Sequence, residues 1–209
     1  MNILIIAIIA ITVIVSVLAF RNNELAGKMV FSAYAIKHRR ESWRFFSYAL
    51  VHAGWIHLFI NMFVLYSFGD AVIQGLYYFF GNTAYLYFIL LYLGGVGFSV
   101  LFDFGKQKDN PNYSAVGASG AVSAVVFSSI LLYPTSSLFL FPIPFPIPAV
   151  VFGVLYLIYS AYMARRGGDN IGHNAHFWGA VYGLVFTIIL KPVLFTRFFE
   201  EIAGWIGII

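Results

Sequence analysis

Polar side chains of the types used in acyl transfer interrupt the apolar stretches of this 209-residue sequence. Ser119 lies in the segment Gly117-Ala118-Ser119-Gly120, whose glycines permit close approach of a substrate backbone. A helix that starts here offers unpaired backbone N–H groups and a positive dipole end, which suit a developing oxyanion. A serine needs a neighbouring base to become nucleophilic, and His176 is the available one. The alternative is that Ser119 only packs or bonds back to its own helix, as most intramembrane serines do.

Three further polar side chains share one earlier apolar stretch. Asn61 follows His57 by four residues, so the two lie on one helical face about one turn apart, and each can donate a hydrogen bond between helices. The alternative is that both only hold neighbouring helices together. His52 precedes His57 by five residues and does not stack beneath it. We expect His52 to connect the preceding loop to the helix.

His176 stands at the start of a stripe of small residues, Ala175, Gly179 and Gly183, which recur every four positions. Such a stripe leaves one helical face nearly bare, so that another backbone can approach closely. Because His176 directly follows Ala175, we expect the histidine beside this contact. His173, three residues earlier, is expected to lie solvated in a connection.

The scarcity of acidic residues in the apolar stretches excludes rival chemistries. A metal-dependent hydrolase would need a His-Glu-x-x-His helix, and no Glu lies near His52 or His57. An aspartyl mechanism needs two facing carboxylates, and a serine triad needs a buried carboxylate behind the histidine. The acid near His176 is Asp169, which follows two arginines and is expected to be a solvated loop charge. The sequence therefore predicts a Ser–His dyad without a metal or a cofactor.

The elements that position these groups are apolar stretches suited to a bilayer. Hydrophobic residues make up 61% of the chain and charged residues 10%, whereas a soluble domain carries about 25% charged residues. Residues 3–20 contain no charge and span roughly 27 Å as a helix, close to the thickness of a hydrocarbon core. This run exceeds the hydrophobic region of a typical cleaved signal peptide, so we interpret it as a retained helix. Five further spans are expected at about 48–69, 84–102, 115–133, 149–164 and 175–190.

We therefore predict an all-α fold, with a six-span transmembrane domain over residues 1–190 and a short interfacial tail over 191–209. Polar segments at 70–82, 103–114 and 165–174 separate spans, and the connection at 134–148 is rich in proline, Pro142 included. Even-numbered spans enter the membrane from the same side, and the candidate groups lie early in those spans. We expect them to meet at one membrane face, with Ser119 about four residues, or roughly 6 Å, inside its helix.

In combination and in order, these segments resemble the rhomboid family of intramembrane serine proteases over about residues 43–183. The matching pieces are Trp43-Arg44, His52-x4-His57-x3-Asn61, Gly117-Ala118-Ser119-Gly120 and Ala175-His176-x-x-Gly179-x-x-x-Gly183. The resemblance implies a six-helix bundle in which Ser119 is the nucleophile and His176 the general base and later the general acid. It implies an oxyanion hole made by His57, Asn61 and the backbone N–H of Ser119, with that of Ala118 as a further candidate. Structural support would come from His52, Trp43, Arg44, Gly117, Gly120, Gly179 and Gly183.

The sequence departs from the family pattern one helical turn after the nucleophile. A tyrosine on which the catalytic imidazole stacks often stands there, whereas this chain has Ser123. The candidates to hold His176 instead are Phe127 and Tyr182.

The resemblance implies that the chain cleaves transmembrane segments of single-span or multi-span membrane proteins, which enter from the bilayer beside the fifth helix. A rhomboid-like binding or quality-control factor without activity is the alternative, although such relatives typically lose the serine or the histidine. A small transporter would be expected to carry polar residues in discontinuous helices. Nucleic-acid binding is not expected, because the net charge of +4 is small and no basic tract is interleaved with aromatic residues.

The distribution of basic residues and the resemblance point to opposite orientations. Ten of the 12 Lys and Arg lie in the first, third and fifth connections, on the catalytic side. The positive-inside rule would place this side in the cytoplasm, whereas the resemblance implies the extracytoplasmic face of the plasma (inner) membrane. We follow the resemblance, because its first connection is a structured segment that lies partly in the membrane.

Overall fold

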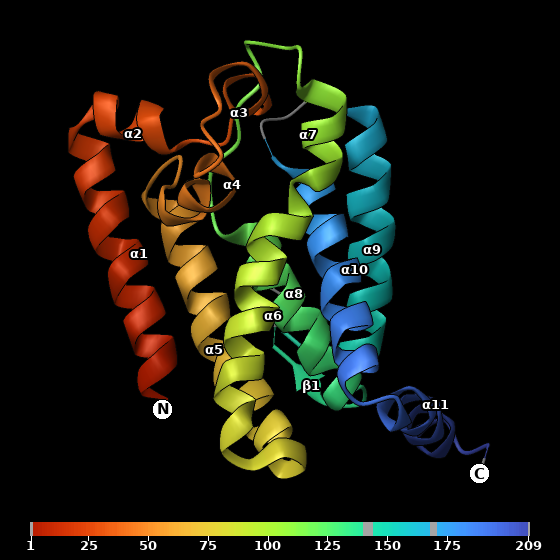
Figure 1. Ribbon diagram of the computed structural model, residues 1–209. Coiled ribbons are helices and arrows are strands. Elements are labelled where there is room, and N and C mark those ends of the chain that lie inside the picture. Colours follow the sequence, from red (N-terminus) through yellow and green to blue (C-terminus); the bar gives the residue numbers. More distant parts are fainter. Residues whose placement is uncertain (1, 140–143, 168–170, 209) are drawn as a thin grey trace.

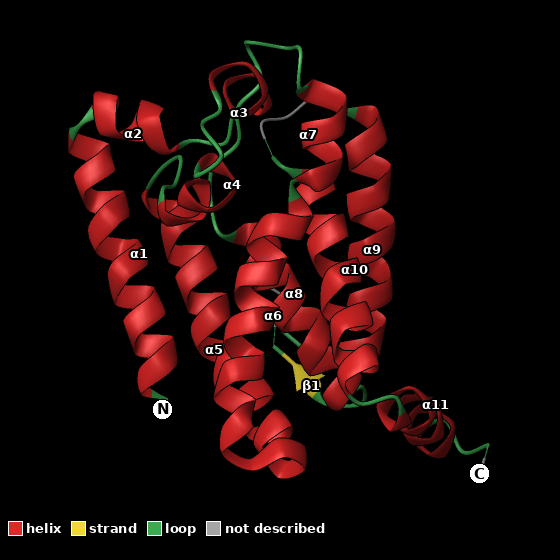
Figure 2. Ribbon diagram, viewed as in Figure 1, coloured by secondary structure: helices red, strands yellow, loops and turns green. Residues whose placement is uncertain are grey.

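The structure is a bundle of long helices with short helices gathered at one end (Figure 1). It is a computed structural model, described over residues 2–139, 144–167 and 171–208. Strand structure is a minor part of the fold (Figure 2): β1 (Ser137–Leu138) pairs antiparallel with β2 (Ile147–Pro148). The long helices are α1 (Ile3–Arg21), α5 (Trp55–Phe80), α6 (Ala84–Ser99), α8 (Ser119–Leu132), α9 (Ala149–Arg166) and α10 (His173–Leu190).

Two helical stretches within the described ranges are long and apolar enough to cross a membrane. The first is α1, and the second is Trp55–Gln107, which joins α5, a short 3-10 turn (Gly81–Thr83), α6 and α7 (Leu101–Gln107). A third results if α10 and α11 (Val193–Trp205), which meet at a bend of 110°, are taken as one span. Apolar helices of this length are those of an integral membrane protein. The count of six spans stays a prediction.

Helix α8 forms the centre of the bundle. Every one of its residues after Ser119 is buried, from Gly120 to Leu132. Its apolar side chains pack against buried residues of α5, α6 and α10, so the helix has no face left for lipid. With 14 residues, α8 is about 21 Å long. The other helices therefore shield a central helix that is shorter than a hydrocarbon core is thick.

Helix α5 is longer and starts later than the sequence predicted. It begins at Trp55, so that His52 precedes it, and it continues through Asp70 to Phe80. The predicted break at 70–82 was wrong except for its last residues. The physical reason is that Asp70 lies at the helix surface and accepts a hydrogen bond from Gln74 one turn later, which a helix tolerates.

The first residues of α8 and α10 also differ from the prediction. Ser119 is the first residue of α8 rather than the fifth, because an antiparallel backbone pair between Phe31 and Ala115 keeps the preceding segment extended. His173 is the first residue of α10 and is buried, so the expectation of a solvated connection was wrong. Its ring packs edge-on against Tyr159 of α9.

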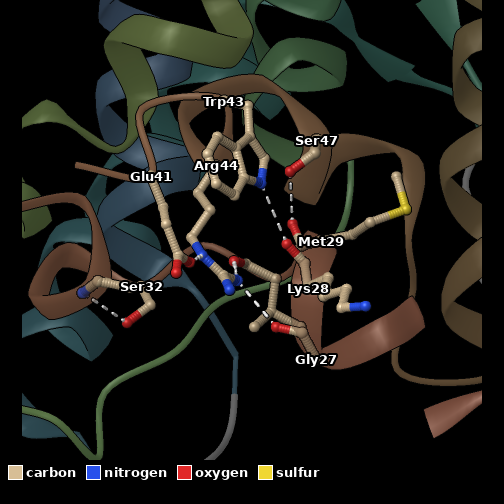
Figure 3. A network of polar contacts seen from close by, with 10 residues as sticks. Gly27, Lys28, Met29, Ser32, Glu41, Trp43, Arg44 and Ser47 are labelled. Carbon is tan, nitrogen blue, oxygen red and sulfur yellow. Dashed lines mark hydrogen bonds and ion pairs between the residues drawn. The ribbon is translucent and has the colours of Figure 1, made fainter. Parts of the chain in front are cut away.

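The first connection folds around the buried guanidinium of Arg44 (Figure 3). Arg44 Nη1 donates to the carbonyl oxygens of Gly27 and Val30, both at 2.8 Å, and its Nε donates to the Glu41 carboxylate. These bonds join α2 (Asn23–Met29) to α4 (Arg44–Ser47), with α3 (Ala33–Arg39) between them. Two further side-chain bonds complete the network, from Trp43 to the Lys28 carbonyl and from Ser47 to the Met29 carbonyl. The connection is therefore a folded cap rather than a free loop.

The connection between α8 and α9 is where the fold departs from all-α. Proline cannot continue a helix but fits extended backbone at the edge of a strand. The strand pair β1–β2 uses this property, with Ser137 opposite Pro148. Pro142 and Asp169, which were predicted to lie in two of the connections, lie outside the described residues.

Candidate active site

The candidate catalytic groups come from three helices that start at the same end of the bundle. In Figure 1, α5, α8 and α10 all begin toward the end that holds α2, α3, α4 and α7. Ser119, His57 and His176 are partly exposed there, while Asn61 and His52 are buried. The arrangement agrees with the expectation that these side chains share one face.

The backbones of α8 and α10 touch. A Cβ placed on Gly179 would overlap the carbonyl group of Gly120, and a Cβ on Gly183 would overlap the backbone of Ala124. Only glycine on α10 permits this approach. The stripe of small residues thus lies where the sequence indicated, at a close helix–helix contact.

This contact lies next to both candidate catalytic residues. A Cβ placed on Gly120 would lie 3.2 Å from the carbonyl oxygen of Ala175. Gly120 directly follows Ser119, and Ala175 directly precedes His176. The first turn of α8 and the first turn of α10 are therefore neighbours, and each carries one member of the predicted dyad.

His57 lies against the turn that precedes the serine. Gly117 has a φ of +105°, a left-handed conformation that favours glycine, and a Cβ there would lie 2.8 Å from His57 Nε2. The Gly117 N–H donates to the Tyr48 carbonyl at 3.0 Å, which fixes the turn to the first connection. A bare Cα thus lets the His57 ring approach the backbone two residues before Ser119.

His52 connects three parts of the chain. The Ser16 hydroxyl on α1 donates to the Leu50 carbonyl at 2.8 Å, so its oxygen accepts from His52 Nδ1 at 2.9 Å. His52 Nε2 then accepts the backbone N–H of Ala118 at an N···N distance of 3.4 Å. The Ala118 N–H, a candidate oxyanion donor in the sequence analysis, is directed at His52 instead. The imidazole ties α1 to the turn that leads into the serine.

Asn61 lies one turn after His57 on α5 and is 4% exposed. Its amide nitrogen donates to the His57 carbonyl oxygen at 3.1 Å. A primary amide carries two N–H donors, so the second can serve a group in the site. This intrahelical bond holds the Asn61 side chain alongside the turn that carries the His57 imidazole.

Tyr156 of α9 contacts His176, in place of the two residues that the sequence suggested. The two rings are nearly parallel, with an interplanar angle of 30° and centroids 6.2 Å apart. Phe127 packs against Tyr156 rather than His176, at 5.5 Å between centroids. Tyr182 faces α6, where its hydroxyl donates to the Leu90 carbonyl at 3.1 Å. Sequence reasoning missed Tyr156 because it lies in an apolar stretch that holds two other tyrosines, Tyr159 and Tyr162.

The Tyr156 hydroxyl reaches the helix that carries the serine. It lies 2.7 Å from Ser123 Oγ, and Ser123 Oγ donates to the Ser119 carbonyl at 2.8 Å. Since Ser123 has one hydroxyl hydrogen and gives it to Ser119, Tyr156 is the donor to Ser123. A chain of two hydrogen bonds thus runs from the ring beside His176 to the carbonyl of Ser119.

Asp103 on α7 is a buried carboxylate that sequence reasoning grouped with the charges of a connection. It is 2% exposed, and it accepts hydrogen bonds from the Tyr113 hydroxyl at 2.8 Å and from Asn174 Nδ2 at 3.0 Å. Tyr113 lies in the segment that leads to α8, and Asn174 lies in the first turn of α10, two residues before His176. One carboxylate therefore joins the two segments that carry the candidate dyad. Its position directly after an apolar stretch was the available signal.

Asp109, six residues farther on, has the opposite setting. It is exposed and pairs with Lys37 and with His38 Nε2, the latter at 3.0 Å. The hydrogen bond from Lys37, and to a smaller extent the one from His38, lowers the pKa of the Asp109 carboxyl below its usual value. Contacts of this kind at the surface contribute little to stability.

The chain is similar to known proteins over most of its length. The model of the rhomboid domain matches residues 39–193. RHOMBOID-like protein 12, mitochondrial, of Arabidopsis thaliana is 27% identical over 144 residues, which cover 62% of this chain and 40% of that protein. Rhomboid-related protein 1 of Caenorhabditis elegans is 29% identical over 183 residues, which cover 83% of this chain and 47% of that protein. The chain thus spans less than half the length of either relative.

Proposed function

Because this chain belongs to the rhomboid family, we propose that it is an intramembrane serine endopeptidase in which Ser119 and His176 form a catalytic dyad. The observation that carries the proposal is the contact between the first turns of α8 and α10. There Gly120, next to Ser119, lies within van der Waals reach of Ala175, next to His176. The family is matched over 39–193, a range that includes every residue of the proposed chemistry.

The proposed reaction has two steps. Ser119 Oγ attacks the carbonyl carbon of the scissile peptide bond, and His176 accepts the hydroxyl proton and passes it to the leaving amine. An acyl-enzyme ester remains on Ser119. In the second step His176 removes a proton from water, the resulting hydroxide attacks the ester, and the proton returns to Ser119 Oγ. The products are a new carboxylate and a free serine.

The oxyanion formed in each step needs preorganised donors. We assign this role to His57, the second N–H of Asn61 and the backbone N–H of Ser119. The contact between His57 and Gly117 supports the assignment, because it brings the imidazole beside the turn before the nucleophile. The start of α8 adds the positive end of a helix dipole. The Ala118 N–H is left out of the set, because it donates to His52.

The proposed substrates are transmembrane segments of single-span or multi-span membrane proteins that reach the site through the bilayer. Helix α9 supports this route, because only three of its 18 residues are buried. A substrate segment can approach the first turns of α8 and α10 along the exposed side of α9, without separating the tightly packed α8–α10 pair.

The test is cleavage of a single-span model substrate by the purified protein in detergent. We expect cleavage by the native chain and a loss on the order of 10³-fold or more in Ser119→Ala and in His176→Ala. Ser129→Ala, on the same helix, is the matched control and should keep activity. A fluorophosphonate probe should label the native chain and not Ser119→Ala. Full cleavage by Ser119→Ala would disprove the nucleophile, and a folded native chain without cleavage or labelling would favour a binding factor.

We also propose that the catalytic end faces the extracytoplasmic side of a plasma (inner) membrane. The folded cap around Arg44 supports this, because several of the basic residues on that side belong to a structured segment rather than to a free loop. The native chain has no cysteine, so Lys108→Cys and Asn82→Cys, the latter in the exposed turn between α5 and α6, place one thiol at each end. An impermeant thiol reagent added to intact cells should label the variant at 108. Labelling of the variant at 82 alone would reverse the orientation.

A further inference from the structure

The side chain of Tyr156 makes contacts with both candidate catalytic segments at once. Its ring lies beside the His176 imidazole, and its hydroxyl is hydrogen-bonded through Ser123 to the carbonyl of Ser119. Two more aromatic side chains fix the ring from behind, Phe127 at 5.5 Å and Phe152 at 5.6 Å between centroids. The ring therefore has little freedom to rotate away from the imidazole.

We propose that Tyr156 is a positioning residue that holds the His176 imidazole in register with Ser119, acting from α9 through its ring and through Ser123. The inference rests on the proposed function and adds to it a residue outside the three helices that supply the chemistry. Aromatic rings prefer offset packing at centroid separations of 4.5–7 Å, which the pair of Tyr156 and His176 satisfies. A general base must keep its nitrogen within hydrogen-bond reach of the nucleophile, so a fixed ring plane contributes directly to rate.

The two ends of Tyr156 contribute unequally. The ring touches the imidazole itself, whereas the hydroxyl acts one step away, by fixing where the ring lies relative to α8. Removal of the flat ring should therefore reduce the rate more than removal of the hydroxyl. Ser123→Ala removes the acceptor of the hydroxyl and should match the smaller effect.

The experiment compares variants of the full chain in detergent, with the single-span substrate. Tyr156→Leu keeps an apolar side chain of sufficient size for folding but lacks a flat ring, and we expect kcat to fall roughly 10-fold with KM unchanged. The kcat of Tyr156→Phe and that of Ser123→Ala should each fall about 3-fold or less. The kcat of the double variant, Tyr156→Phe with Ser123→Ala, should fall no further than that of either single variant. Tyr162→Leu, on the exposed side of the same helix, is the matched control and should not change kcat.

A second readout does not need catalysis. Histidine labelled with ¹³C at Cε1 gives one NMR signal per residue, and the His176 signal is the one lost in His176→Asn. The ring current of Tyr156 should displace this signal in the native chain and in Tyr156→Phe. In Tyr156→Leu the signal should move, and in Tyr162→Leu it should not. A native chain without activity whose His176 signal still responds to Tyr156→Leu would overturn the proposed function and leave the ring contact standing.

Three results would overturn the inference itself. The first is a kcat of Tyr156→Leu equal to that of Tyr162→Leu in an active enzyme. The second is a His176 signal that does not move in Tyr156→Leu. The third is a rise in KM at constant kcat in Tyr156→Leu, since it would make Tyr156 a residue of the substrate path.

Discussion

Helix α8 holds its two neighbours at the site, α10 and α9, in opposite ways. Against α10, backbone meets backbone, because Gly179 and Gly183 have no side chain to separate the helices. Against α9, the contact is made by the ends of side chains: a Cβ on Gly153 would lie 3.1 Å from Ile130 Cδ1. Six residues of α10 are buried and three of α9, in helices of equal length. Against α8, α10 is therefore held more tightly than α9.

The difference separates two tasks. The residue proposed as the base lies on the fixed helix, next to the backbone contact that sets its distance from α8. The ring proposed to orient that base lies on the looser helix. Three substitutions measure whether the two interfaces differ as much as their contacts indicate.

The largest effect is expected for Gly179→Ala. The added methyl group would overlap the Gly120 carbonyl, and because backbone cannot turn aside as a side chain can, the helices must separate. We expect a loss of about 3 kcal/mol or more in the free energy of unfolding, measured by denaturant titration in mild detergent. Gly27→Ala, where nothing lies within 4 Å, is the control. Equal stability of the two variants would show that the backbone contact between α8 and α10 does not hold α10 tightly.

Asp103→Asn, which weakens a bond to the first turn of α10, should have an intermediate effect. The substitution leaves one acceptor oxygen where there were two, so either Tyr113 or Asn174 loses its partner in a buried place. We expect a loss of about 1–2 kcal/mol in the free energy of unfolding. Asn174→Ala should lower the free energy of unfolding by less in the Asp103→Asn variant than in the native chain.

The control for Asp103 is Asp109→Asn, since that carboxylate is exposed and its ion pairs lie at the surface. Its loss of stability should be the smaller of the two. If the exposed acid proved the more costly to remove, the bond from α7 to α10 would have no role in fixing the first turn of α10.

The smallest effect is expected for Gly153→Ala on α9. The methyl group would meet the flexible end of Ile130 at 3.1 Å, which can shift, and alanine favours a helix over glycine by about 1 kcal/mol. The two terms oppose each other, so the free energy of unfolding should change by less than about 1 kcal/mol in either direction. A loss as large as that of Gly179→Ala would show that α9 is as tightly held as α10.

Features that repeat along the chain could be predicted from the sequence. The stripe of Ala175, Gly179 and Gly183 has a helical period, and it indicated a close helix contact that the structure contains. The family could also be predicted, because its motifs are local segments in a fixed order. The match over residues 39–193 confirms it. These features need only short-range information.

Features that depend on partners far apart in the chain could not be predicted from the sequence. The first residue of α8 is set by the pairing of Phe31 with Ala115, 84 positions apart in the chain. Tyr156 meets Ser123 from another helix, and no spacing within its own stretch distinguishes it from its neighbours. The burial of Asp103 follows from Tyr113 and Asn174 closing over it, whereas the charged residues beside it indicated solvent.

The shortness of α8 bears on how deep the proposed nucleophile lies in an apolar layer. A helix of about 21 Å falls short of a hydrocarbon core of about 30 Å by roughly two turns. In Figure 1, α8 begins below the level that α7, α9 and α10 reach. The polar side chains at that end would favour hydration. For the proposed reaction, water would then have to reach only the start of α8, and the serine's depth is set by where one helix begins.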